Sequence, residues 1–304
     1  MVSEGMERVI NLLKQQNEAD VKKRVEDGRN GLEQLAAIDQ IPEDVTIKEF
    51  SVKGIPSVWI NTPEIEREQV ILYLHGGGYI EGSINSHKSL GARISRASKS
   101  RVLLIDYRLA PENPYPAALE DSVTAYKWLV DEEGIDPKNI VISGDSAGGG
   151  LTAATLIKLR DTGIPLPFAA VLLSPWTDLD ITGDSVRSKR RIDPFVTADG
   201  LFFMANLYVG DEDPKNPYIS PLYADLKGLP PLLIQVGSAE ILLDDSTRFA
   251  EKAKSAGVDV TLEVWEDMVH VFQAFALWAP EGKEGIEKIG IYIQKLMKKE
   301  VQLT

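Results

Sequence analysis

One serine lies in a setting that suits a nucleophile. Residues 144–148 read GDSAG; they follow the β-branched run 140–142 and open a stretch of small residues, 149–160, that is compatible with a helix. In a G-x-S-x-G elbow the glycines allow a sharp strand-to-helix turn, so the serine hydroxyl projects clear of the sheet edge. The spacing therefore predicts that Ser146 is a nucleophile, and the rest of the chain has to supply its partners.

A glycine-rich loop further upstream offers the second part of this chemistry. Residues 75–79 read HGGGY and follow an apolar run. Attack on an ester carbonyl creates a tetrahedral oxyanion, which unobstructed backbone N–H groups stabilise. We expect an oxyanion hole with donors from Gly77, Gly78 and Ala147, and with Gly76 shaping the turn. A phosphate-binding loop is the alternative, but neither glycine stretch ends in Gly-Lys-Ser/Thr.

A serine nucleophile needs a base, and the chain has three histidines. His75 belongs to the glycine loop, which we expect it to orient by hydrogen bonding. His87 lies at an expected helix start, where a capping or structural role is expected. His270 lies late in the chain, at a loop-to-helix junction after the last expected strand. Because hydrolases with this elbow place nucleophile, acid and histidine in that order along the chain, His270 is the predicted base.

The acid is expected in the turn after the apolar run 232–236. Three carboxylates lie there, those of Glu240, Asp244 and Asp245. The two aspartates directly precede a helical pattern at 246–256, so helix capping and favourable charge at a helix N-terminus account for them. Glu240 lies just past the strand end, where it could reach an imidazole on the neighbouring loop. We therefore favour Glu240 as the acid and keep Asp244 as the alternative.

The elements that would position these residues alternate between strands and helices. Short apolar or alternating runs predict strands at 46–52, 57–60, 70–74, 102–105, 140–142, 169–173, 232–236 and 258–264. Helical patterns lie between the later strands, at 90–97, 117–130, 149–160 and 246–256. Near-continuous hydrophobic strands that alternate with helices are typical of a parallel sheet buried on both faces. The sequence predicts an α/β fold with a mostly parallel eight-stranded sheet, an antiparallel leading pair and a last strand near the sheet edge.

A long excursion interrupts this alternation. After residue 177 the chain runs about 55 residues to the next strand, which is too long for a plain connection. The excursion carries Asp-Pro-Phe at 193–195 and an aromatic, helix-like segment at 201–208. We expect it to form part of a helical cap that walls an apolar pocket. The alternative is an additional helix that packs on the core and has no contact with substrate.

The N-terminal part of the chain is expected to complete this cap. Residues 6–38 form a charged helical pattern that Gly28 and Gly31 are expected to interrupt. A central core and two covering segments follow from these patterns. The expected division is N-terminal cap helices at 1–45, a cap insertion at 181–224, and a catalytic core at 46–180 and 225–304.

Composition excludes several kinds of protein. The 304 residues include no cysteine, which rules out disulfides, thiol catalysis and thiolate metal sites. The net charge of −13 argues against nucleic acid or anionic membrane surfaces as partners. There is no apolar run of about 18 residues that could span a membrane, and the first residues do not form an apolar signal region. We expect a cytoplasmic protein with neither cofactor nor metal, acting on a small molecule.

Together these motifs resemble a known family, the hormone-sensitive-lipase-like carboxylesterases of the α/β-hydrolase superfamily. The resemblance covers about residues 45–300 and rests on 75–79 (HGGGY), 106–112 (DYRLAPE), 144–149 (GDSAGG), 174–176 (SPW) and 270–272 (HVF). It implies the same nucleophile, base and oxyanion donors as above. Many members have an aspartate followed by Pro-Leu where this chain has Glu240, whereas a subset has Glu in a similar E-x-L-L-D-D setting.

The resemblance also implies what the protein does. Members have an α/β-hydrolase fold with a helical cap, hydrolyse short- to medium-chain acyl esters without a cofactor, and in many cases dimerise through the last strand. We therefore expect an ester hydrolase with a Ser-His-Glu triad and an acyl-enzyme intermediate, and a homodimer through the last edge strand. A lactonase or amidase with the same machinery, and a non-catalytic ligand receptor on the same scaffold, are the alternatives.

Overall fold

The computed structural model describes residues 2–18, 25–65 and 69–301. Its centre is a sheet of eight strands: β1 (Thr46–Val52), β2 (Ile55–Asn61), β3 (Val70–Leu74), β4 (Arg101–Ile105), β5 (Ile140–Asp145), β6 (Ala169–Leu173), β7 (Leu232–Gly237) and β8 (Val260–Trp265). The strand order is β1-β2-β4-β3-β5-β6-β7-β8. β2 pairs antiparallel with β1 and β4, and all other neighbours pair parallel. The predicted mostly parallel sheet with an antiparallel leading pair is confirmed.

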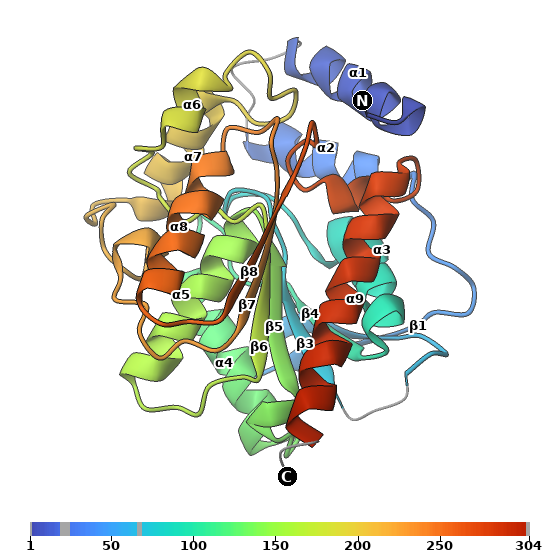
Figure 1. Ribbon diagram of the computed structural model, residues 1–304, viewed down its shortest axis with the longest axis vertical. Coiled ribbons are helices and arrows are strands. Elements are labelled where there is room, and N and C mark those ends of the chain that lie inside the picture. Colours follow the sequence, from blue (N-terminus) through green and yellow to red (C-terminus); the bar gives the residue numbers. More distant parts are fainter. Residues whose placement is uncertain (1, 19–24, 66–68, 302–304) are drawn as a thin grey trace.

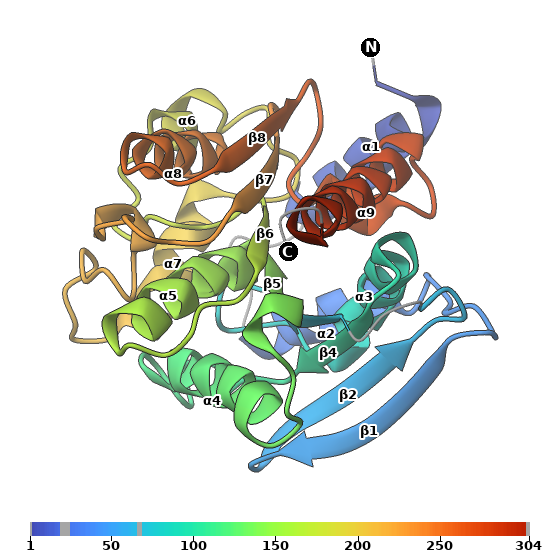
Figure 2. The same cartoon turned by 60° about the horizontal axis from the view of Figure 1, so that its bottom comes forward.

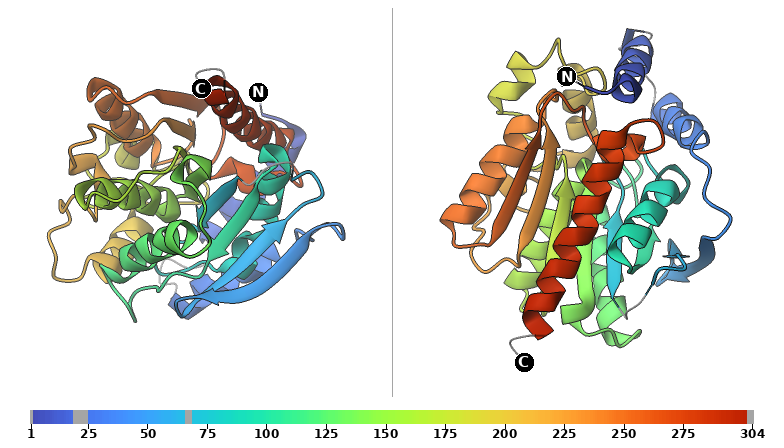
Figure 3. Two further views of the ribbon diagram at one scale, coloured as in Figure 1. Left: turned by 90° about the horizontal axis from the view of Figure 1, so that it is seen from below. Right: turned by 45° about the vertical axis from the view of Figure 1, so that its right-hand side comes forward.

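Helices cover both faces of the sheet (Figure 2). One face packs against α4 (Ala117–Asp131), α5 (Ala147–Asp161) and α8 (Leu243–Ser255), and the other against α3 (Ile84–Ser98) and α9 (Pro280–Val301). Figure 3 shows α9 running along the sheet beside α3. The central strands β3, β5 and β6 are buried along their whole length because both of their faces are covered. None of the helices in the described ranges is both long and apolar enough to cross a bilayer.

The C-terminal helix α9 is an element that the expectations above omit, although the sequence carries its signal. Ile286, Ile289 and Ile293 are spaced three and four residues apart and are buried against the sheet and α3. Pro280 stands at the first helical position, where its missing N–H costs nothing.

The N-terminal helical pattern corresponds to α1 (Glu4–Glu18) and α2 (Val25–Ala36). The expectation that Gly28 and Gly31 interrupt a helix is wrong, since both lie inside α2. Gly28 instead permits a close approach, because a Cβ there would lie 1.7 Å from Oε1 of Glu81. The part of the expected helix at residues 19–24 lies outside the described residues. Figure 1 shows α1 and α2 across the upper end of the molecule, the end at which the parallel strands finish.

The segment 181–224 contains α6 (Asp184–Ser188), α7 (Ala198–Val209) and the short 3-10 helix η2 (Pro221–Tyr223). α7 confirms the expected aromatic helix, and its Leu201, Ala205 and Tyr208 pack into the main hydrophobic core. α6 is too short to have been read from periodicity. In Figure 1, α6 lies at the same end of the molecule as α1 and α2.

Candidate active site

Ser146 occupies the turn between β5 and α5. Its φ of 53° and ψ of −119° lie in a region that is costly for any residue with a side chain. Backbone hydrogen bonds hold it there: its N–H donates to the carbonyl of Leu173 (2.8 Å), and its carbonyl accepts from Gly150 (3.0 Å) and Trp176 (2.9 Å). A Cβ at Gly148 would lie 2.0 Å from a backbone oxygen of β3, so this close turn requires glycine there.

His270 and Glu240 are brought together by the loops after β8 and β7. Nδ1 of His270 lies 2.6 Å from Oε2 of Glu240, and both side chains are buried. Oε1 of the same carboxylate accepts from the N–H of Gly237 and the hydroxyl of Ser174, each at 2.7 Å. The Ser174 hydroxyl also accepts from the N–H of Val271 (3.1 Å). With Nδ1–H donating to this fixed carboxylate, Nε2 is the basic nitrogen of the ring.

Neighbouring carboxylates raise the pKa of His270. Burial lowers the pKa of the imidazole, but the charge and hydrogen bond of Glu240, together with the charges of Asp193 and Asp145, raise it by more. The net direction is upward from 6.5. The surroundings therefore stabilise the imidazolium that forms when this group takes a proton.

The two aspartates after the glutamate serve other parts of the chain. Oδ2 of Asp244 accepts from the N–H of Ser185, on α6, at 2.8 Å. Oδ2 of Asp245 accepts from the N–H groups of Thr177 and Asp178, each at 2.8 Å. The expectation that both aspartates cap α8 is wrong, because α8 begins without a side-chain cap and both carboxylates bind other segments. Both residues still lie in the first turn of α8, where the helix dipole favours negative charge.

The glycine loop adopts a conformation that suits glycine, with φ of 113° at Gly77 and 59° at Gly78. Across the described ranges, the N–H groups of Gly77, Gly78 and Ala147 make no hydrogen bond to another segment. Gly76 differs, because its N–H donates to Oδ1 of Asp145 at 3.1 Å. An N–H engaged in this way is not available to an oxyanion, so Gly76 is left out of the donor set proposed below and anchors the turn instead.

A buried ion pair supports the glycine loop. The carboxylate of Asp145 accepts from the hydroxyl of Tyr73 (2.8 Å) and lies 3.4 Å from Nε2 of His87. Burial raises the pKa of Asp145, but the charge of His87 and two hydrogen bonds outweigh it, so the pKa is lowered. Burial likewise lowers the pKa of His87, but the charge and hydrogen bond of Asp145, the hydrogen bond to the Ser83 backbone and the charge of Glu33 together outweigh this, so that pKa is raised. The loop thus rests on a carboxylate that stays ionised.

His75 orients the loop in its neutral form. Burial lowers its pKa to about 3. Its Nδ1 lies 2.7 Å from the carbonyl of Gly76, and its ring stacks on Tyr107 with centroids 4.2 Å apart. His75 and His87 therefore both support the loop, and their pKa values are shifted in opposite directions. Among the described residues, no three His, Asp or Glu side chains are grouped so that they could hold a metal ion.

The segment 181–224 contacts both the glycine loop and the candidate base. A Cβ on Gly78 would lie 2.0 Å from Sδ of Met204, so α7 covers the loop directly. Tyr208 of α7 stacks on the tyrosine of the HGGGY motif, with centroids 3.8 Å apart and 5° between the planes. The ring of Phe195 has its centroid 6.0 Å from that of His270. Apolar side chains from one segment thus lie beside two parts of the site.

The N-terminal helices contact the same region. Arg29 of α2 donates from Nε to the carbonyl of Ile80 (2.8 Å) and from Nη2 to the carbonyl of Ala110 (3.1 Å). It also forms a two-pronged ion pair with Glu112 at 2.9 and 2.7 Å. α1 packs buried apolar side chains against the loop that carries His270. α2 is therefore bound to the end of the glycine loop and to the DYRLAPE segment.

Comparison with known proteins identifies the family. A family model described as an alpha/beta hydrolase fold matches residues 71–274. An acetyl-hydrolase of Streptomyces hygroscopicus is 43% identical over 236 residues, which is 78% of each chain. An esterase of Acinetobacter venetianus is 37% identical over 266 residues, which is 87% of each chain. The chain belongs to the α/β-hydrolase family.

Solved structures place this hydrolase among esterases. The crystal structure of an esterase from the bacterial hormone-sensitive lipase family has a TM-score of 0.94 and 46% identity, covering 97% of this chain and 99% of that one. The esterase EstE5, from a crystal soaked with p-nitrophenyl butyrate, has a TM-score of 0.92 and 44% identity over 97% of this chain and 99% of its own. The resemblance to hormone-sensitive-lipase-like esterases is confirmed, and with it an ester hydrolase on the α/β-hydrolase fold.

Three polar residues of this hydrolase site were not singled out from the sequence. Ser174 bonds Glu240, Asp145 holds the glycine loop, and Asp193 bonds the turn that carries Glu240. Ser174 and Asp145 do lie within the SPW and GDSAGG motifs, and Asp193 opens the Asp-Pro-Phe stretch. Their motifs were therefore visible, but their partners lie 48 to 69 residues away in the chain.

Proposed function

We propose that this esterase hydrolyses short- to medium-chain acyl esters with Ser146 as nucleophile, His270 as base and Glu240 as acid. The observation that carries the proposal is the 2.6 Å contact of His270 with Glu240 beside the serine elbow. The carbonyl of Leu173 accepts from Ser146, and the next residue, Ser174, bonds both Glu240 and the residue after His270. The end of β6 therefore bonds the backbone of Ser146, the side chain of Glu240 and the backbone directly after His270. EstE5, soaked with p-nitrophenyl butyrate, supports the substrate class.

The proposed mechanism follows from these roles. Nε2 of His270 takes the proton of the Ser146 hydroxyl as Oγ attacks the acyl carbon, and the Glu240 carboxylate stabilises the imidazolium. The N–H groups of Gly77, Gly78 and Ala147 stabilise the oxyanion. The imidazolium then gives its proton to the departing alcohol, which leaves an acyl-enzyme. Water, deprotonated by the same imidazole, releases the acid and regenerates the serine.

We further propose that residues 1–45 and 181–224 form a cap over a core of residues 46–180 and 225–304. The contacts of Met204 with the glycine loop and of Phe195 with the base support this division. Apolar side chains beside the glycine loop and the proposed base would form the wall of a pocket for an acyl chain.

Replacing the nucleophile tests the proposal. Ser146→Ala should lower kcat for p-nitrophenyl butyrate by at least about 10³-fold and leave the circular dichroism melting curve cooperative. An organophosphonate should label the wild type at one serine and fail to label the variant, as measured by intact-protein mass spectrometry. Ser188→Ala, at an exposed position of α6, is the matched control and should react like the wild type. Labelling that persists in Ser146→Ala would refute the assignment.

A further inference from the structure

The turn that carries Glu240 is clamped by side chains from the segment 181–224. The N–H of Ile241 donates to Oδ2 of Asp193 at 2.8 Å. The carbonyl of Ile241 accepts from the hydroxyl of Ser185 at 2.6 Å. Both backbone groups of the residue after the proposed acid are thus bound by side chains that lie 48 and 56 residues earlier in the chain.

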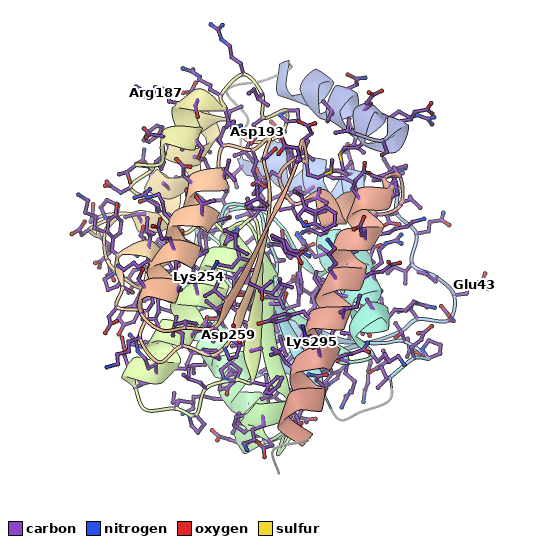
Figure 4. The ribbon with its side chains drawn as sticks, viewed as in Figure 1. Glu43, Arg187, Asp193, Lys254, Asp259 and Lys295 are labelled. Carbon is purple, nitrogen blue, oxygen red and sulfur yellow. The ribbon has the colours of Figure 1, made fainter. Side chains whose placement is uncertain are left out.

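Asp193 is a buried carboxylate whose bonds are all directed at backbone. Its Oδ1 accepts from the N–H groups of Phe195 (2.8 Å) and Val196 (2.9 Å), while Oδ2 binds Ile241. Figure 4 shows Asp193 at the upper end of the molecule, where β8 ends. One side chain therefore ties the loop that bears Phe195, which lies beside His270, to the turn that bears Glu240.

Ser185 is held equally firmly. Its hydroxyl accepts from the N–H of Asp244 at 3.0 Å, and its own N–H donates to Oδ2 of Asp244 at 2.8 Å. This reciprocal pair fixes the hydroxyl in the direction of the Ile241 carbonyl. Asp244 thus acts through Ser185 on the turn that carries Glu240. This explains why the Asp244 carboxylate points toward α6.

A triad needs this precision. A shift of about 1 Å in a catalytic group can cost about 100-fold in rate. Rotation of the Glu240–Ile241 peptide would swing the Glu240 side chain away from His270. The hydrogen bonds of the Glu240 carboxylate fix the end of the side chain. The backbone from which it projects accepts a longer bond from the N–H of Leu243 at the Glu240 carbonyl (3.4 Å), and the two bonds to Ile241 are shorter.

We propose that Asp193 and Ser185 are positioning residues that hold Glu240 against His270 through the backbone of Ile241. The segment that covers the acyl pocket then also aligns the acid with the base. This inference rests on the proposed role of Glu240, and the experiment below separates the failure of one from the failure of the other.

The central variant is Asp193→Asn. Its single carbonyl oxygen can replace Oδ1 or Oδ2 but not both, because the amide NH₂ cannot accept a hydrogen bond. We expect kcat per active site to fall by about 10- to 100-fold, with KM within about 3-fold of the wild type. The loss should be the same for p-nitrophenyl acetate and butyrate. Organophosphonate titration counts the active sites, and Asp184→Asn, exposed on the same segment, is the matched control.

A double-mutant cycle tests whether Asp193 acts through the acid. In a Glu240→Gln background, Asp193→Asn should cause little further loss of kcat, because the group it positions no longer works. Ser185→Ala, a smaller change, should behave in the same way and serves if Asp193→Asn does not fold. Three carboxylates, Glu240, Asp193 and Asp145, raise the pKa of His270, so Asp193→Asn should also move the acidic limb of kcat/KM to lower pH.

The outcomes are distinct. A lower melting temperature with unchanged kcat per active site, or losses that add to those of Glu240→Gln, would show a merely structural role and overturn the inference. A loss confined to butyrate would assign Asp193 to the pocket wall and overturn it as well. If Glu240→Gln itself keeps wild-type activity, the proposed acid fails and this inference fails with it. If Glu240→Gln is crippled while Asp193→Asn and Ser185→Ala are not, the inference alone fails.

Discussion

At the scale of single residues, three neighbouring carboxylates have three different partners. Glu240 binds an imidazole, Asp244 binds α6, and Asp245 binds the backbone of residues 177 and 178. All three lie within one short turn and the first turn of α8. What each carboxylate binds is therefore determined by the direction in which its side chain points, and not by whether the residue is Asp or Glu. This makes them a set in which isosteric substitutions can be compared directly.

We predict that Glu240→Gln lowers kcat for p-nitrophenyl butyrate by about 10³- to 10⁴-fold, as neutralising the acid of a serine protease triad does. Asp244→Asn should cost less than about 10-fold, because a single amide oxygen can still accept the one N–H that this carboxylate binds. Steady-state kinetics, with thermal melts to verify folding, provide the measurement. Loss of activity in Asp244→Asn together with an active Glu240→Gln would make Asp244 the acid.

The pH dependence follows from the raised pKa of His270. The imidazole must be neutral to take a proton, and its folded pKa lies above 6.5. The value of kcat/KM should therefore rise with pH through a midpoint above 6.5, and activity should be lost as the pH falls through that midpoint. A rate profile between about pH 5 and 8 measures it. A flat profile over that range would contradict a histidine base.

The sequence identifies the residues whose setting is local. The serine elbow and the glycine loop are recognisable because their spacing within a few residues determines their geometry. The use of the Gly76 N–H by Asp145 is not recognisable, because the two residues are 69 positions apart. The clamps on Ile241 escape sequence reading for the same reason, and only the folded chain brings Asp193 and Ser185 to it.

At the scale of elements, α7 is the helix that faces the glycine loop. Met204 projects from it toward Gly78, whereas Phe203, its neighbour in sequence, is 45% exposed. The two residues lie on different faces of one helix. They therefore offer a paired test of whether α7 limits the acyl chain.

We predict that Met204→Trp lowers kcat/KM more for hexanoate than for acetate esters. One methylene in an apolar pocket is worth about 1–3 kcal/mol, so the change in selectivity should exceed about 10-fold across the series. Phe203→Trp, on the exposed face, should leave the chain-length profile unchanged. A series of p-nitrophenyl esters provides the measurement, and equal losses for every ester with Met204→Trp would indicate a packing defect instead.

The elements themselves were predictable where their patterns are long. The central strands and the helices between them lie near their expected positions because continuous apolar runs and helical periodicity mark them. Gly28 misled the prediction, since glycine is a poor helix former and its close approach to Glu81 exists only in the fold. α6 has five residues, which are too few for a helical repeat of apolar residues to be recognised in the sequence.

At the scale of the whole molecule, the sheet ends at β8. This strand pairs with β7 on one side, and its Val264 is 46% exposed. An uncovered strand edge with an apolar side chain can pair with a second copy across a two-fold axis. The homodimer that is expected through this strand therefore stays a prediction, in which β8 with its Val264 would be the contact surface.

We predict that the wild type is a dimer and that Val264→Lys shifts it toward monomer, because charged side chains discourage edge pairing. Val264→Thr, which keeps the β-branched shape and is neutral, should remain dimeric. Size-exclusion chromatography with light scattering over a concentration series gives the mass. A monomeric wild type, or a Val264→Lys variant that stays dimeric, would contradict pairing through β8.

The two segments that are proposed to form the cap are anchored to different parts of the candidate site. Arg29 ties α2 to the end of the glycine loop, and Asp193 ties the segment 181–224 to the acid turn. A chimera that received 181–224 from a relative would therefore inherit that relative's alignment of acid and base, unless it kept Asp193 and Ser185. New substrate ranges in such an enzyme are expected to arise by exchange of side chains that are proposed to line the pocket, such as Met204, while the polar anchors stay in place.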